Sequence, residues 1–167
     1  MRTRRTVRGQ SLVELALTLT VLVLLLSGAV TFGMAFFSYV SMRDAAQEGA
    51  LFGSFSPYDD VNGNGRYESG TEGPNIDGIR QRVRDTSSSP VDFSNTTLIP
   101  DSYITVEATN GNNKACEGNV SGVTNAIRVT VEYDFPVFMP FVGAITGDEI
   151  HLTASVTDTI LEPACPP

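Results

Sequence analysis

The sequence holds few residues of the kinds that bind zinc or act as nucleophiles. Of its 167 residues, two are cysteine and one is histidine. Cys116 and Cys165 form no C-x-x-C pair, which argues against a zinc site. In an exported protein these cysteines could form a disulfide or remain two lone thiols, and the sequence leaves both alternatives open. No motif ties a nucleophile or a carboxylate to His151, so we interpret it as a strand histidine without a catalytic role.

Basic residues are also scarce, and they are unevenly placed. The chain has 11 Lys and Arg against 19 Asp and Glu, a net charge of -8. Four of the cations precede residue 9, namely Arg2, Arg4, Arg5 and Arg8. From Ser41 onward, seven basic side chains stand against 18 acidic ones. An acidic body of this kind repels a phosphate backbone, so we expect no nucleic-acid partner.

Charge is absent altogether between Leu15 and Phe37. At ~1.5 Å per residue this stretch makes a helix of about 34 Å, which crosses the ~30 Å hydrocarbon layer of a membrane. The arginines before it predict a cytoplasmic N-terminus, with the residues after Tyr39 outside. A cleaved signal peptide is the alternative, but its apolar region covers only ~7 to 15 residues and ends at a small-x-small site. The longer stretch here has no such site, so we predict a single-pass membrane anchor.

A plain anchor does not explain Glu14, because a carboxylate at the start of a membrane helix is costly. A basic leader ends in Gly9, and Glu14 is the fifth residue after that glycine. This arrangement resembles the prepilin-peptidase site of type IV pilins. The resemblance implies cleavage between Gly9 and Gln10, with prepilin peptidase as a partner and Glu14 paired to a newly formed α-amine. The alternative is that Glu14 lies at the membrane interface and reaches the headgroups.

The segments that follow extend this resemblance. Residues 9–17 open the apolar helix, and residues 44–50, Asp-Ala-Ala-Gln-Glu-Gly-Ala, close it. In this order they resemble the TadE-like family, the minor pilins of the tight-adherence (type IVc) system. Leu15 departs from the Phe that the family often has, which exchanges one apolar residue for another. The resemblance covers about the first 50 residues, and it implies a structural protein without enzymatic activity that assembles with other pilin subunits.

Beyond the membrane we predict an α+β fold that is pilin-like, with the long N-terminal helix packed on a small antiparallel sheet. An apolar side at i, i+3, i+4 and i+7 from Met42 continues the helix to an end near Gly53 and Pro57. Periodicity predicts a helix at 76–85 capped by Asn75, and strands at 103–109, 126–135 and 150–157. Prolines break the apolar stretch 135–142, so it cannot be a regular central strand. The predicted domains are a basic leader (1–9), a transmembrane and assembly helix (10–40) and an extracytoplasmic head (41–167).

The loop from Asp60 to Glu68 resembles a calcium loop. Oxygen ligands at positions one, three and five come from Asp60, Asn62 and Asn64, and a glycine at position six allows a tight turn around a hard cation. The acid expected at position twelve is absent, but Glu72, one residue later, or Asp77 could serve instead. We therefore name Asp60, Asn62, Asn64, Glu68 and Glu72 as candidate calcium ligands. The alternative is a turn-rich loop without metal, because Asn-Gly pairs favour turns in any case.

The sequence as a whole predicts a structural minor pilin or pseudopilin of a type IVc pilus or a related secretion machine. Small residues on the helix would allow other pilin helices to approach closely; they are Ala16, Gly28, Ala29 and Gly33. The densest basic cluster of the head is predicted to lie on a solvated helix face; it comprises Arg80, Arg82 and Arg84. The rival is a single-span surface binding protein or adhesin that does not polymerise, with or without calcium dependence. That rival would keep residues 1–9 and tolerate Glu14→Ala.

Overall fold

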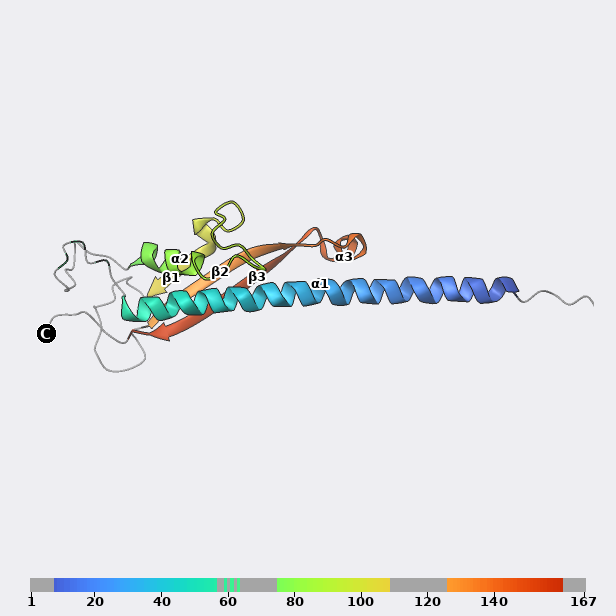
Figure 1. Cartoon of the computed structure of the whole chain (residues 1–167), viewed down its shortest axis with the longest axis horizontal. Coiled ribbons are helices and arrows are strands. Elements are labelled where there is room, and N and C mark those ends of the chain that lie inside the picture. The colour runs from blue at the N-terminus through green and yellow to red at the C-terminus, as the bar shows by residue number, and fades with distance from the viewer. Residues whose placement is uncertain are drawn as a thin grey trace, which may run out of the picture. The chain divides into compact units, whose positions relative to one another are not determined.

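The computed structural model describes residues 8–56, 59, 61, 63, 75–108 and 126–160. In chain order its elements are α1 (Arg8–Phe55), α2 (Ile76–Arg84), the 3-10 turn η1 (Asp101–Tyr103), β1 (Ile104–Ala108), β2 (Ala126–Pro136), α3 (Pro140–Thr146) and β3 (Glu149–Thr159) (Figure 1). The chain divides into two compact units. The first unit holds Met1–Phe36 and Phe135–Ile150, and the second, the head unit, holds Phe37–Asp134 and His151–Pro167.

α1 is one uninterrupted helix of 48 residues. It contains no proline and is rich in leucine, which favours helix. Three threonine hydroxyls bond back to carbonyls one turn earlier: Thr18 to Glu14 and Thr31 to Ser27 at 3.0 Å, and Thr20 to Ala16 at 2.8 Å. These bonds satisfy hydroxyl groups within the helix, where an apolar environment would offer them no water. The helix ends at Phe55, close to the predicted end.

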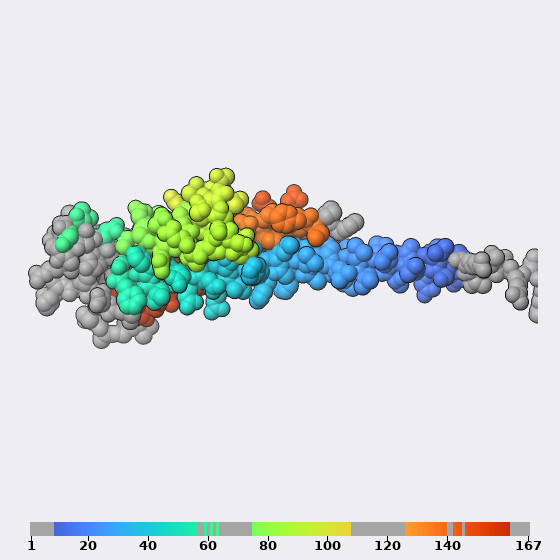
Figure 2. Space-filling view, viewed as in Figure 1, coloured from blue at the N-terminus to red at the C-terminus, as the bar shows by residue number. Residues whose placement is uncertain are grey.

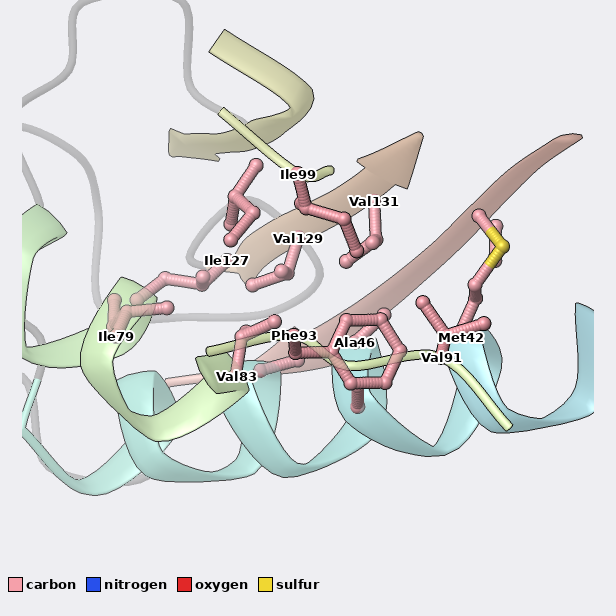
Figure 3. Packing of buried hydrophobic residues seen from close by; sticks show 14 of the residues in the cluster. Met42, Ala46, Ile79, Val83, Val91, Phe93, Ile99, Ile127, Val129 and Val131 are labelled. Carbon is pink, nitrogen blue, oxygen red and sulfur yellow. The ribbon is translucent and has the colours of Figure 1, made fainter. Parts of the chain in front are cut away.

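The head unit is organised around an apolar core (Figure 3). From α1, the side chains of Met42, Ala45 and Ala46 are fully buried, as the helical periodicity predicts. The other core side chains with no exposed surface come from α1, α2, the following loop and the sheet; they are Ala50, Ile79, Val83, Phe93, Ile99, Ile104, Val129 and Val131. The burial of this apolar surface is the main term that favours folding of the head.

Two glycines let α1 approach its neighbours closely. A Cβ built at Gly49 would lie 2.5 Å from Cγ2 of Val83. One built at Gly53 would lie 2.8 Å from Cδ1 of Ile79 and 2.9 Å from Cδ1 of Ile127. No side chain fits at such distances without displacing its neighbours. The contact between α1 and α2 therefore depends on residues that lack a Cβ.

A third glycine makes room for the cap of α2. The side chain of Asn75 accepts a hydrogen bond from the backbone N–H of Gly78 at 2.9 Å, which satisfies one of the free donors at the helix start. A Cβ at residue 78 would overlap this side chain. The predicted cap is thus confirmed, and the glycine that weakens the helical pattern has a packing reason.

The sheet has three antiparallel strands in the order β1-β2-β3. β1 and β2 pair with Ile104 opposite Val131 and Val106 opposite Val129. Buried and more exposed residues alternate along β2, so one face lies on the core and the other faces outward. The three predicted strands are confirmed with ends that differ by one or two residues, and so is the α+β fold with its long N-terminal helix.

Between β2 and β3 the chain forms a short helix that periodicity did not predict. β2 ends at Pro136, and α3 begins at Pro140. Proline is tolerated in the first turn of a helix, because the N–H that it lacks would have no partner there. The backbone N–H of Val137 donates to the carbonyl of Asp148 at 2.8 Å and so closes the turn. The predicted proline break is therefore present, but α3 is an addition that the structure reveals.

Candidate processing and assembly segment

The predicted cleavage site lies in the first turn of α1. Gly9 and Gln10 are exposed, and a Cβ built at Gly9 would meet nothing within 4 Å. Backbone N–H groups in the first turn of a helix have no partner within it, and helix ends fray easily. The bond between these residues is thus accessible from the side.

The side chain of Glu14 is exposed one turn further along α1. No basic side chain of the described residues forms an ion pair with it. The hydroxyl of Thr18 bonds to the main-chain oxygen of residue 14 and not to its carboxylate. Its apolar neighbours Val13 and Leu15 are exposed as well. A charge set in apolar surface is costly at membrane depth, so this carboxylate is suited to a cationic partner from another molecule.

The following turns of α1 present apolar side chains on every side. The leucines and valines between Leu12 and Leu26 that are exposed range from 39% to 68% in exposed fraction. Figure 2 shows this blue portion of the helix uncovered in the view drawn. A helix that is apolar all round needs apolar surroundings. α1 is long and apolar enough to cross a membrane, which fits a single-pass membrane protein.

Small residues interrupt this apolar surface at the predicted positions. A Cβ built at Gly28 or at Gly33 would meet nothing within 4 Å, in contrast to one at Gly49. Ala16 and Ala29 are exposed as well. The space beside these residues is open, so another helix can approach the backbone of α1 closely there.

A comparison with known protein families bears on the same residues. Residues 9–51 match the family model described as TadE-like protein. This segment of the chain is similar to TadE-like proteins. The predicted resemblance is thereby confirmed over these residues, and the family points to a pilin-like protein associated with a Tad pilus and to a structural role. No curated protein and no solved structure gives a significant match to the chain.

Outside the TadE-like segment, the prediction that Arg84 lies on a solvated helix face is wrong. Its side chain is only 10% exposed, and it pairs with Asp101. Its guanidinium also donates to the carbonyls of Phe93 at 2.9 Å and Ile99 at 3.2 Å. The fixed fork of donors lets one arginine bind several oxygens at once. Arg84 therefore fastens α2 to the loop before β1, whereas Arg82 stays 54% exposed as predicted.

The head unit also contains a hydrogen-bonded group that the sequence motifs did not reveal. The hydroxyl of Tyr103 donates to Oδ2 of Asp134 at 2.6 Å, and Nδ1 of His151 lies 2.7 Å from Oδ1 of the same carboxylate. Oε2 of Glu132 lies 4.0 Å from Nε2 of the imidazole. The hydrogen bond to Asp134 raises the pKa of His151. The hydrogen bonds from Tyr103 and then from His151 lower the pKa of Asp134.

This group is produced by the register of β2 and β3. The hydroxyls of Thr130 and Ser155 meet at 3.1 Å across the same two strands, in line with Asp134 and His151. His151 is 53% exposed, so the group lies at the surface. Its arrangement suits a pH-dependent contact that holds η1, β2 and β3 together better than it suits proton transfer to a bound substrate.

Two predicted sites lie outside the described residues. They are the candidate calcium ligands Asp60, Asn62, Asn64, Glu68 and Glu72, and the cysteines Cys116 and Cys165. Within the part of the chain that the structure describes, no three His, Cys, Asp or Glu side chains are grouped to hold a metal ion. Calcium binding and disulfide formation stay predictions.

Proposed function

We propose that this chain is a minor pilin or pseudopilin of a type IVc (tight-adherence) pilus or a related secretion machine, cut by a prepilin peptidase between Gly9 and Gln10. The observation that carries the proposal is the TadE-like match, which begins at the glycine itself and covers nearly all of α1. The exposed Glu14 and the uncovered apolar surface of the helix support it.

The proposed mechanism is assembly through α1. Before cleavage, the arginines of the leader hold the N-terminus at the cytoplasmic side of the membrane. Cleavage removes them and creates a free α-amine at Gln10. The apolar helix can then leave the lipid for a bundle of similar helices, because both environments are apolar. Pairing between Glu14 and an α-amine would offset the cost of burying either charge alone.

The mature N-terminus tests the proposal. The full chain is produced together with a cognate prepilin peptidase and its mass is determined. We expect a chain that starts at Gln10, and a Gly9→Leu variant that keeps its leader. Gly33→Leu is the matched control, since it changes another open glycine of α1 and should be cut normally. An intact leader on the unaltered chain would overturn the proposal and favour the single-span surface binding protein.

Calcium binding by the loop that contains Asp60, Asn62 and Asn64 belongs to the same proposal as a second element. Its oxygen-rich spacing supports it. Titration calorimetry of the full chain with calcium should give heat, and EDTA should lower the melting temperature. Neither effect would be seen if the loop were only turn-rich.

A mass shift on alkylation with and without reduction would show whether Cys116 and Cys165 are paired.

A further inference from the structure

The turn between β2 and β3 carries an apolar tip, defined here as residues 135–147. The tip contains no charged residue, although Asp134 precedes it and Asp148 follows it. Phe138 is 69% exposed, and its ring meets that of Phe135 edge-on with centroids 6.2 Å apart. Exposed apolar surface bounded by carboxylates marks a place that contacts another apolar phase or partner.

The tip belongs to the same compact unit as the apolar part of α1, and α3 lies alongside that part (Figure 1). Thr31 and Ala35 of α1 are only 5% and 9% exposed, whereas Phe32 and Phe36 beside them are 73% and 58% exposed. One strip of the helix is therefore covered while its flanks stay open. By helical rise, the covered residues lie about 3 to 9 Å before the end of the uncharged stretch at Phe37.

The backbone of the tip suits a place with little water. Its two prolines lack an N–H that would need a partner. Hydrogen bonds within the turn satisfy others: Val137 N–H to Asp148 O at 2.8 Å, Val142 and Gly143 N–H to Met139 O at 3.0 Å, and Gly147 N–H to Gly143 O at 2.9 Å. Irregular backbone enters the region near lipid only when its polar groups are paired in this way.

We propose that the apolar tip inserts into the interfacial layer of the bilayer that α1 spans. Lipid is the occupant that the geometry favours, because the tip lies beside a helix stretch that itself requires apolar surroundings. The carboxylates of Asp134 and Asp148 stay in water and limit the depth of insertion. The chain then contacts the membrane at two places, whether or not Gly9 is a cleavage site.

Single tryptophans test this proposal directly, because the chain has none of its own. The full chain carrying Phe138→Trp is reconstituted in phosphatidylcholine vesicles with or without bromine atoms on the acyl chains. Phe32→Trp, on the span, is the control that lipid should quench. Phe55→Trp is the control that lipid should spare, because it lies about 27 Å beyond Phe37 along α1. All three replaced phenylalanines are exposed, at 69%, 73% and 56% respectively.

We expect brominated lipid to quench the Phe138→Trp variant nearly as strongly as the Phe32→Trp variant, while the Phe55→Trp variant keeps its emission. Emission of the Phe138→Trp variant that is as insensitive to bromine as that of Phe55→Trp would overturn the proposal. A blue-shifted but unquenched spectrum would also overturn it, since the tip would then be covered by protein, such as a second copy of the chain.

Discussion

At the scale of single residues, the group formed by Tyr103, Asp134 and His151 makes the head sensitive to pH. The pKa of His151 is raised by its hydrogen bond to Asp134, so its contribution to stability is complete below the usual histidine pKa of about 6.5. That contribution is lost as pH rises through the raised pKa. The pKa of Asp134 is lowered, first by Tyr103. Its contribution is present above about 3.9 and is lost as pH falls through the lowered pKa.

Replacing His151 with glutamine should therefore weaken the head most in the window between about pH 4 and pH 6.5, where both groups are charged. Above the raised pKa of His151 the variant and the unaltered chain should unfold alike, because the imidazole is then neutral. The effect is small, since exposed charge pairs are screened by water. Hydrogen exchange of β2 and β3 in the full chain measures it.

Tyr103→Phe serves as the control for this pH dependence. It removes a hydrogen bond to Asp134 but leaves the imidazole, so the loss of stability at high pH should persist. If the His151→Gln variant lost as much protection at about pH 8.5 as it does at about pH 6, another group would be responsible for the pH dependence.

At the scale of elements, periodicity in the sequence predicts most of the structure correctly. The three strands follow from strict alternation, and α2 follows from its apolar face and from the Asn75 cap. Patterns of period two or 3.6 appear whenever one face of an element is buried, as in both these cases. α3 was missed because a short, proline-flanked apolar stretch has no such period.

The side-chain sites show why sequence reasoning goes less far there. The carbonyls that hold Arg84 belong to Phe93 and Ile99 in an irregular loop, and main-chain oxygens leave no mark in a sequence. The contact of His151 with Asp134 depends on the register of two strands. Either strand alone predicts only that its residue faces outward.

The contact between α1 and α2 gives a prediction for Gly49→Ala. The new Cβ would lie 2.5 Å from a methyl group of Val83, so either this side chain must shift or the two helices must move apart. We expect the head to lose about 1–3 kcal/mol of unfolding free energy, the usual cost of overpacking. The loss is measured by denaturant unfolding of the full chain in detergent, with hydrogen exchange of β2 as the readout.

Two further variants decide whether packing causes this loss. Gly33→Ala places a Cβ in open space and should leave the unfolding of the head unchanged. Val83→Ala combined with Gly49→Ala should lose less than the sum of the two single variants, because the second change removes the clash. Strictly additive losses would place the cause elsewhere.

At the scale of the whole molecule, α1 is divided along its length: its later part packs in the head core, and its earlier part presents apolar side chains to the surrounding lipid or to other helices. The core cluster of described residues takes nothing from α1 before Met42. The exposed apolar side chains of α1 lie mostly before that residue. Lipid around the first part of the helix can therefore be exchanged for other helices without breaking a contact of this core. Such a division is what a subunit needs if it is to pass folded from a membrane into a filament.

The same division predicts what Glu14→Gln should do. The change removes one charge from the exposed surface of α1 and touches no core contact, so head unfolding should not change and membrane insertion should not be weakened. If the carboxylate pairs with an α-amine in the assembly, its loss leaves that amine buried and unpaired. We expect assembly, measured by cross-linking between subunits, to fall at least about tenfold, because a coupling of only about 1.4 kcal/mol gives that factor.

Glu48→Gln is the matched control for this experiment, since it neutralises an acid of the same helix that pairs with Arg82 in the head. It should lower assembly little. Cross-linking of the Glu14→Gln variant at the level of the unaltered chain would mean that the carboxylate is not buried against a charge. Glu14 would then lie at the membrane interface, and its position five residues after Gly9 would matter for cleavage alone.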